Sequence, residues 1–173
     1  MTPINAGRVK VRAEPVHSSR QSGDGRPRGR TRVEVYQEQK DAYRGVIAAI
    51  SAGDLAGLAA FVAQDMVDHN PMPGQAPGIV GFKQWVSAVR SSFPDFRGSV
   101  ETVLAEEDLV AGRVTWRGTQ RGSFLGVPPS DRQVEIAAFH IVRLSAGRIV
   151  EWWGTADLLG ALEQVGARIS PPP

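Results

Sequence analysis

The chain has 173 residues, enough for one domain whose core forms without a metal or a disulfide. It has no cysteine, which excludes disulfides, thiolate nucleophiles and thiolate metal sites and predicts a cytoplasmic protein. The charge of +2 is uneven: residues 1–32 carry eight basic and two acidic side chains, and the other 12 basic and 16 acidic ones leave residues 33–173 mildly acidic.

The first 32 residues are rich in Gly, Pro, Ser and Arg and almost free of large apolar side chains, which predicts a disordered basic tail. The tail has no aromatic residue to stack on a base, so nucleic acid is not an expected partner. It is either a solvated segment or the product of a start site placed upstream of a natural start at Val33 or Val35. No stretch approaches the roughly 18 apolar residues that span a bilayer, and we expect no membrane contact.

A helical period runs from Val35 to Gly53. Asp54 is then a suitable N-cap for a second, short helix. The inner face of that helix would be Leu55, Leu58, Phe61 and Val62. Residues 66–70 are expected to be extended, residues 71–78 form a Pro- and Gly-rich loop, and a third helix follows until Pro94 ends it.

After Pro94 the period becomes two, which predicts strands near 97–105, 109–119, 133–144 and 148–155. A last helix is expected over 157–165, and the Pro-rich end, 169–173, is expected to be disordered. This order predicts an α+β fold in which a curved antiparallel sheet packs against three N-terminal helices, with a short C-terminal helix. Such a cone has a mouth at one end, where ligand pockets are common.

Six short motifs stand in a characteristic order. They are Asp68-His69-Asn70-Pro71, Gly81-Phe82-Lys83, Phe93-Pro94-Asp95, Arg117-Gly118-Thr119, Gly122-Ser123-Phe124-Leu125-Gly126-Val127-Pro128-Pro129 and Gly147-Arg148-Ile149-Val150-Glu151. Over about residues 36–166 the chain resembles the SnoaL-like polyketide cyclases of the NTF2-like superfamily. The resemblance implies a domain over 33–168, no cofactor, a hydrophobic polyketide-like substrate, and a role in antibiotic or other secondary metabolism.

The resemblance also implies a reaction. Aldol cyclases of this family close rings with an aspartate on the last strand as acid/base and a histidine on the preceding strand that orients the substrate, and some relatives are implicated in hydroxylation. His140 matches the histidine, whereas counting along the last strand places Gly154 at the position of the aspartate. Two alternative functions are therefore open. The first is a cofactor-independent acid/base enzyme for ring closure, isomerisation or hydroxylation, and the second is a non-catalytic binding or dimerisation module.

The candidate catalytic residues are His140, Asp68 and His69. His140 alternates onto the apolar face of its strand, where it is either a proton-exchanging or carbonyl-binding group or a core histidine satisfied by a neighbour. Asp68 and His69 point to opposite sides if extended, so at most one of them faces inward. With only three histidines in the chain, we expect no metal site.

Five further residues are candidates for substrate binding, on helix, loop and strands. They are Asn70, Phe82, Trp116, Gln120 and Trp152. A tryptophan can stack on a flat ligand but is often plain core, and Gln120 either supplies an amide to a substrate oxygen or lies in a solvated turn.

The outer face of the sheet is expected to mix apolar and basic side chains. Its members are Arg113, Thr115, Arg117, Phe139, Ile141, Arg143 and Trp153. This mixture suits a self-complementary surface and predicts a homodimer formed through the sheet.

Overall fold

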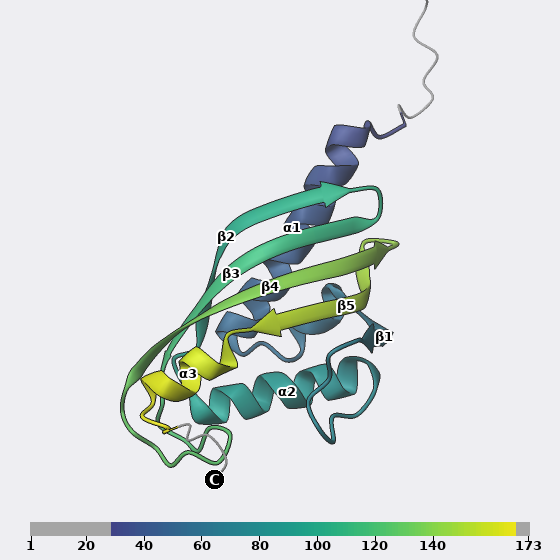
Figure 1. Cartoon of the computed structure of the whole chain (residues 1–173). Helices are drawn as coiled ribbons and strands as arrows, with labels where there is room; N and C mark the ends of the chain where they lie inside the picture. The colour runs from purple at the N-terminus through teal and green to yellow at the C-terminus, as the bar shows by residue number, and fades with distance from the viewer. Residues whose placement is uncertain (1–28, 169–173) are drawn as a thin grey trace, which may run out of the picture.

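The computed structural model describes residues 29–168, and the parts of the predicted basic tail and Pro-rich end at 1–28 and 169–173 lie outside the described residues. Within residues 29–168 there are three α-helices, one 3₁₀ turn and five strands (Figure 1). In order they are α1 (Arg32–Ala52), η1 (Gly57–Ala60), β1 (Val62–Asp68), α2 (Gly78–Ser92), β2 (Arg97–Glu106), β3 (Leu109–Thr119), β4 (Gln133–Ser145), β5 (Arg148–Ala156) and α3 (Leu158–Gln164).

The sheet has the order β1-β5-β4-β3-β2, in which β2 to β5 form an antiparallel meander and β1 runs parallel to β5. The four predicted strands are confirmed with bounds that differ by at most one residue. The sheet is nevertheless mixed and not wholly antiparallel as expected, because the segment before the Pro-rich loop joins it as a fifth, edge strand.

The predicted second helix is present only as the 3₁₀ turn η1, and Val62, expected on its inner face, begins β1 instead. Asp54 is not its N-cap, which is Ala56, but the Asp54 Oδ1 accepts from the N–H of Gly57, the first residue of the turn, at 2.8 Å. The chain then leaves the helical path, because the Phe61 carbonyl accepts from the Ile149 N–H at 2.7 Å and draws the following residues beside β5. A strand hydrogen bond from a distant part of the chain therefore overrides the local helical pattern.

Helix α1 begins at Arg32, three residues before the first residue of its apolar stripe. Thr31 and Glu34 form a reciprocal capping box there, and Gly53 ends the helix in the left-handed conformation at φ 69°. Its buried face includes Tyr43, which is fully enclosed and projects toward the sheet side of the core.

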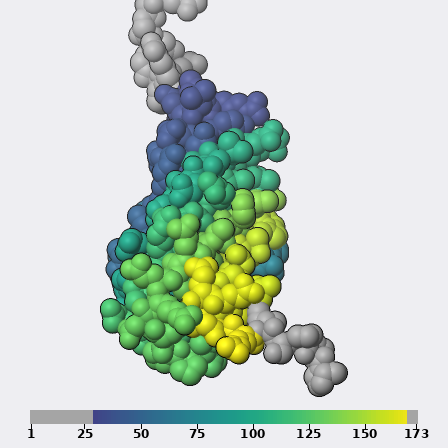
Figure 2. Space-filling model, turned by 60° about the vertical axis from the view of Figure 1, so that its left-hand side comes forward, coloured from purple at the N-terminus to yellow at the C-terminus, as the bar shows by residue number. Residues whose placement is uncertain are grey.

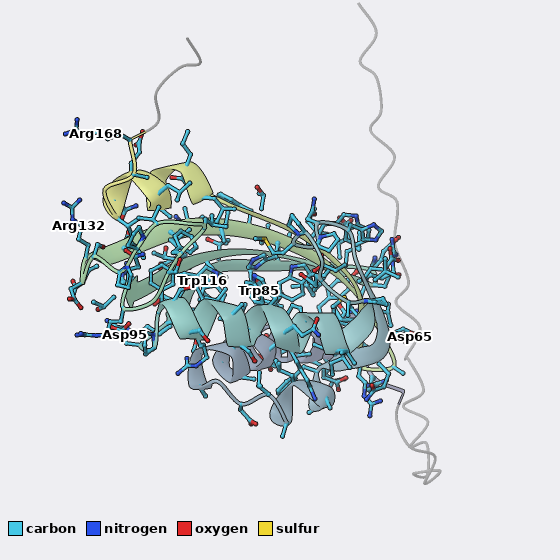
Figure 3. The ribbon with its side chains drawn as sticks, turned by 90° about the horizontal axis from the view of Figure 1, so that it is seen from below. Asp65, Trp85, Asp95, Trp116, Arg132 and Arg168 are labelled. Carbon is cyan, nitrogen blue, oxygen red and sulfur yellow. The ribbon has the colours of Figure 1, made fainter. Side chains whose placement is uncertain are left out.

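Helices α1 and α2 lie on one side of the curved sheet, and Trp85 and Trp116 point into the space between α2 and the sheet (Figure 3). Along β4 the even-numbered side chains are buried and most odd-numbered ones are exposed, as expected from strand alternation. In β5 the expected alternation fails at Val150, because a bulge places Ile149 in the core on the same side as Trp152.

Helix α3 follows β5 and lies along the part of β4 that β5 does not cover. Asp157 caps it by accepting from the Gly160 N–H at 2.8 Å. The Gln164 side chain then donates to the Glu135 carbonyl at 3.0 Å and accepts from the Glu135 N–H at 2.8 Å. These two bonds replace the pair that the backbone of a neighbouring strand would make with Glu135. In the space-filling view α3 lies toward the opposite end of the molecule from the start of α1 (Figure 2).

Within residues 29–168, none of the helices has the length and apolar character needed to cross a membrane.

Candidate active site

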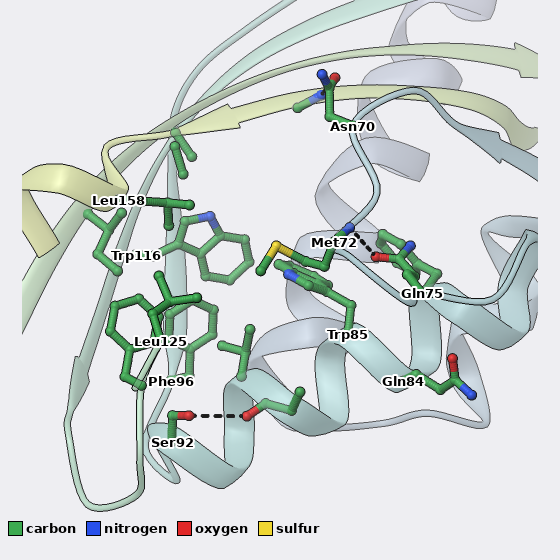
Figure 4. A pocket seen from close by; sticks show the side chains of 18 of the residues that line it. Asn70, Met72, Gln75, Gln84, Trp85, Ser92, Phe96, Trp116, Leu125 and Leu158 are labelled. Atoms are coloured by element: carbon green, nitrogen blue, oxygen red, sulfur yellow. Dashed lines mark hydrogen bonds between the residues drawn. The ribbon is translucent and has the colours of Figure 1, made fainter. Parts of the chain in front are cut away.

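A cavity of about 660 Å³ lies between α2, the inner face of the sheet and the loops at residues 70–75 and 123–125. This volume is within the range of about 300–1,000 Å³ that is usual for small-molecule sites. Figure 4 shows Trp85, Trp116 and Met72 converging on its interior, with Leu125 and Leu158 on one side and Gln75 on another.

The walls are largely aromatic. Seven Phe and Trp side chains of the described residues line the cavity, from α2, the turn after it, the sheet and the loop after β3: Phe82, Trp85, Phe93, Phe96, Trp116, Phe124 and Trp152. Phe96 and Trp116 stack with ring centroids 4.7 Å apart and planes 5° from parallel. The other pairs of lining rings are tilted or edge-on to one another, so the walls are apolar and aromatic and suit a hydrophobic ligand.

Among residues 29–168, the only ionisable side chains that line this cavity are Asp68 and His140, and no lysine or arginine of this range does. Among residues 29–168 there is also no cluster of three or more His, Asp or Glu side chains arranged to hold a metal ion. The cavity therefore has no cation to neutralise a phosphate or carboxylate group on a ligand.

His140 lies in the middle of β4, and 8% of its surface is exposed, toward the cavity. Its Nδ1 is 2.8 Å from the hydroxyl of Tyr43 on α1. Burial lowers the pKa of His140 from 6.5 to about 4, and burial also raises the pKa of Tyr43 above its usual value of 10. Both groups are therefore uncharged at neutral pH.

Glycine flanks His140 on both neighbouring strands, because Gly112 of β3 and Gly154 of β5 are its cross-strand partners. A Cβ at residue 112 would lie 2.4 Å from the phenol of Tyr43, so only glycine lets that ring reach His140. On the other side, Gly154 itself lines the cavity. The position that the resemblance assigns to an aspartate thus lies beside His140, as the counting predicted, and holds no side chain.

Asp68 and Asn70 line the cavity where β1 ends. Asp68 accepts from the Gln75 side chain at 2.9 Å and from the Asn70 N–H at 3.0 Å. The Asn70 side-chain oxygen accepts from the Gly154 N–H at 3.1 Å, which ties the loop to β5. Asp68 is therefore a fixed carboxylate that faces the ligand space.

His69 points to the opposite face of the sheet, in agreement with the prediction that at most one of the adjacent pair faces inward. Its Nε2 is 2.8 Å from Glu151, and its ring stacks on Trp153 at a centroid distance of 4.3 Å. Glu151 also accepts from Arg143 at 2.7 Å. The hydrogen bond with His69, followed by that with Arg143, lowers the pKa of Glu151. His69 is outside the candidate site.

Gln120 is also not among the residues that line the cavity. It is fully buried, so neither a free amide nor a solvated turn describes it. Its Nε2 donates to three backbone carbonyls at 3.0–3.1 Å, and its Oε1 accepts from the Ser130 hydroxyl at 2.6 Å. The three carbonyls belong to Gly122, Val127 and Pro128. Gln120 holds the loop between β3 and β4 and has no polar atom left for a ligand.

The other four candidates for substrate binding, Asn70, Phe82, Trp116 and Trp152, all line the cavity. Tyr43, which contacts the candidate histidine, is a functional residue that the sequence alone does not single out. The sequence does indicate that the Tyr43 hydroxyl has a hydrogen-bond partner in the core, because a tyrosine on the buried stripe of a helix needs one. No sequence signal identified that partner.

Comparison with known proteins gives consistent results. A sequence model of the SnoaL-like polyketide cyclase family matches residues 40–165. A search of curated proteins finds no match.

Solved structures with the same fold include three from Streptomyces. IdmH from Streptomyces antibioticus, a candidate polyketide cyclase, is 34% identical, with a TM-score of 0.67 over 75% of this chain and 99% of its own. TsrD from Streptomyces laurentii is 26% identical, with a TM-score of 0.71 over 76% and 97%. AclR from Streptomyces galilaeus, a candidate hydroxylase, is 26% identical, with a TM-score of 0.68 over 79% and 86%.

The family match covers well over half of the chain. The alignments with TsrD and IdmH, which share the α+β cone, cover almost the full length of those two proteins. The chain therefore belongs to the SnoaL-like polyketide cyclase family.

Proposed function

We propose that this protein is a cofactor-independent acid/base enzyme that closes a ring, or catalyses a related isomerisation, in a hydrophobic, carbonyl-rich small molecule. The observation that carries the proposal is the cavity, whose walls are aromatic and whose only ionisable groups are Asp68 and His140. A flat polyketide-like molecule is hydrophobic and uncharged, and it presents carbonyl oxygens that need hydrogen-bond donors.

In the proposed reaction, Asp68 takes a proton from a carbon next to a carbonyl group of the bound ligand. The resulting enolate carbon attacks a second carbonyl carbon of the same molecule. One carbon–carbon bond forms, and the oxygen of the second carbonyl becomes an alkoxide that takes the proton back. Enclosure by the aromatic walls holds the two reacting carbons close together and excludes water.

The test uses an uncharged aromatic diketone, a phenylacetone with an ortho acetyl group, whose two arms close into a fluorescent methylnaphthol with loss of water. We expect the wild type to accelerate naphthol formation over buffer and Asp68→Asn to lose about 100-fold or more of that acceleration. His140→Ala should also slow the reaction. His69→Ala serves as the matched control and should keep the wild-type rate, because His69 is on the other face of the sheet.

A binding module is the second candidate, and Gly154 is the observation that favours it, because no carboxylate stands beside His140. This candidate predicts that the diketone binds in the cavity with no increase in the rate of ring closure. A wild type that neither binds nor converts the diketone would contradict both candidates. Oxygenated products would favour hydroxylation, the reaction class named for AclR.

We also propose that two copies associate through the outer face of the sheet. Leu104, Ala111, Ile141 and Trp153 are successive cross-strand neighbours there. Leu104 and Ile141 are 65% and 47% exposed in the single chain, and such an apolar row is typical of an interface. Sedimentation should give a dimer at micromolar concentration and a monomer for Ile141→Lys. A monomeric wild type would refute the proposal.

The cytoplasmic location and the role in antibiotic biosynthesis stay predictions.

A further inference from the structure

We propose that the N–H groups of His140 Nε2 and Trp152 Nε1 form a two-donor site for a carbonyl oxygen, and that Tyr43 is the positioning residue that fixes the required tautomer of His140. The inference deepens the proposed function and rests on it for the identity of the ligand. It gives His140 the role of an uncharged hydrogen-bond donor, beside Asp68 as the proton acceptor.

The tautomer follows from the partners of Tyr43. Its hydroxyl is fully buried, and among the described residues its only hydrogen bond is with His140 Nδ1, at 2.8 Å. If Nδ1 carried the proton and donated it, the phenol O–H would be buried without an acceptor, which is costly. Tyr43 therefore donates to Nδ1. An uncharged imidazole that accepts at Nδ1 carries its proton at Nε2.

The two nitrogens open onto the cavity. His140 and Trp152 both line it, and neither His140 Nε2 nor Trp152 Nε1 has a hydrogen-bond partner in the described part of the chain. Neither is sealed in the core either, since the single buried side-chain nitrogen or oxygen without a partner among those residues is Gln39 Oε1. Both N–H groups are thus free for a ligand.

Gly154 provides the space in which the two donors meet. A Cβ at this residue would lie 2.8 Å from Trp152 Nε1 and 3.3 Å from His140 Cδ2, the ring carbon bonded to Nε2. The two rings are themselves in contact, with centroids 4.8 Å apart. A ligand oxygen placed above Gly154 can therefore approach both N–H groups, and a side chain at residue 154 would take its place.

The chemistry of the site defines the ligand group. Two uncharged donors bind a ketone oxygen and stabilise the negative charge that develops on it when the neighbouring carbon loses a proton. The cavity has no cation, and Asp68 repels anions, so a carboxylate is disfavoured. In this arrangement Asp68 receives the proton, and the two donors hold the enolate oxygen.

The first test uses acetylnaphthalene with a ¹³C-labelled carbonyl as a flat, uncharged ketone, and infrared spectroscopy of the bound carbonyl stretch. We expect wild type to lower the stretching frequency relative to the ketone in hexane. Trp152→Phe should raise the frequency and weaken binding about tenfold. Trp153→Phe is the matched control, since this neighbouring ring lies on the other face of the sheet, and it should leave frequency and affinity unchanged.

The second test measures the ¹⁵N shifts of His140, assigned with His140→Gln and His69→Gln. Wild type should give a protonated Nε2 and an unprotonated, hydrogen-bonded Nδ1. Tyr43→Phe keeps the ring, and it should shift the Nδ1 signal and raise the carbonyl frequency of the bound ketone. Tyr36→Phe, which removes the hydroxyl of the other tyrosine, should do neither, because Tyr36 contacts Arg32 and the Glu107 backbone.

The outcomes separate this inference from the proposed function. A wild type that does not bind the ketone contradicts the proposed function. Binding with a carbonyl frequency that Trp152→Phe leaves unchanged, or a His140 protonated at Nδ1, overturns the two-donor site while the cavity stands. Unchanged ¹⁵N shifts in Tyr43→Phe, with wild-type circular dichroism, overturn the positioning role of Tyr43.

Discussion

Trp152 and Trp153 follow one another in β5, and each packs against a histidine on its own face of the sheet. On the inner face, the ring centroids of Trp152 and His140 are 4.8 Å apart, and the hydrogen-bond partner of His140 is the uncharged phenol of Tyr43. Outside, Trp153 stacks on His69 at 4.3 Å, and that histidine is hydrogen-bonded to a carboxylate that also accepts from Arg143.

The same two residue types thus have different chemistry on the two faces. On the inner face burial keeps the imidazole uncharged, and on the outer face Glu151 and Arg143 form a half-exposed ionic network. A motif such as Asp68-His69 can therefore be assigned a role only once the face of each residue is known. Four predictions test the contrast, beginning with the largest effect.

The first prediction compares the two tryptophans. Trp152→Ala should lower the free energy of unfolding by about 3–5 kcal/mol, because it leaves a void among Phe82, His140 and Tyr43. Trp153→Ala should cost about 1 kcal/mol, since its ring is only half-buried. Urea denaturation at equal protein concentration measures both values. Equal losses would remove the distinction between the faces.

The second prediction concerns pH. The pKa of His140 is about 4 in the folded protein and near 6.5 when unfolded, so between these values the unfolded chain binds more protons. Stability should therefore be fully present above pH 6.5 and fall as the pH drops toward 4, by about 3 kcal/mol from this group alone. His140→Gln should lose this component of the pH dependence in urea denaturation, and His69→Gln should retain it.

The third prediction compares the glycines on either side of His140. Gly112→Ala should destabilise the protein by about 1–3 kcal/mol, because the new methyl group overlaps the Tyr43 ring, which has no room to retreat. Gly154→Ala should cost less stability but weaken ketone binding, because its methyl group occupies the space between the donors. Calorimetric unfolding and ketone titration separate these effects, and a reversed order would contradict the assignment.

The fourth and smallest effect is on the outer face. His69→Ala removes the first cause of the lowered pKa of Glu151, the hydrogen bond with the His69 ring, so that pKa should rise toward its usual value, while Arg143 still holds it partly down. Carbon NMR of the Glu151 carboxyl group measures the change. The ¹⁵N shifts of His140 should stay as in wild type, and a change there would show that the two faces are coupled.

The sequence predicted the meander and the inner face of β4 closely, because each strand has a clear period of two and is bounded by Gly, Asp or Pro. It also placed Gly154 beside His140, since counting along two antiparallel strands joined by a tight turn fixes their register. From β2 to β5, the period-two pattern of the sequence agrees with the strand pairing of the structure.

The sequence failed where distant segments decide the structure. The residues after Asp54 have a helical pattern, yet they pair with β5 because Ile149 hydrogen-bonds to Phe61. Simple alternation from Trp152 would place Val150 in the core, and a bulge, which has no sequence signature here, turns it away. The contact between Tyr43 and His140 joins residues 97 positions apart, and periodicity carries no information on such pairs.

The loop that follows β3 is fixed through its main chain. Gln120 donates to three of its carbonyls, and Ser92 donates to a fourth, that of Ser123. The side chains of Phe124 and Leu125, which line the cavity, take no part in these bonds. Phe124 also packs edge-on against the buried Phe93, whereas Leu125 is 49% exposed, so Leu125 is the position where natural selection or an engineer can change which molecules fit the cavity while the main-chain bonds of the loop stay intact.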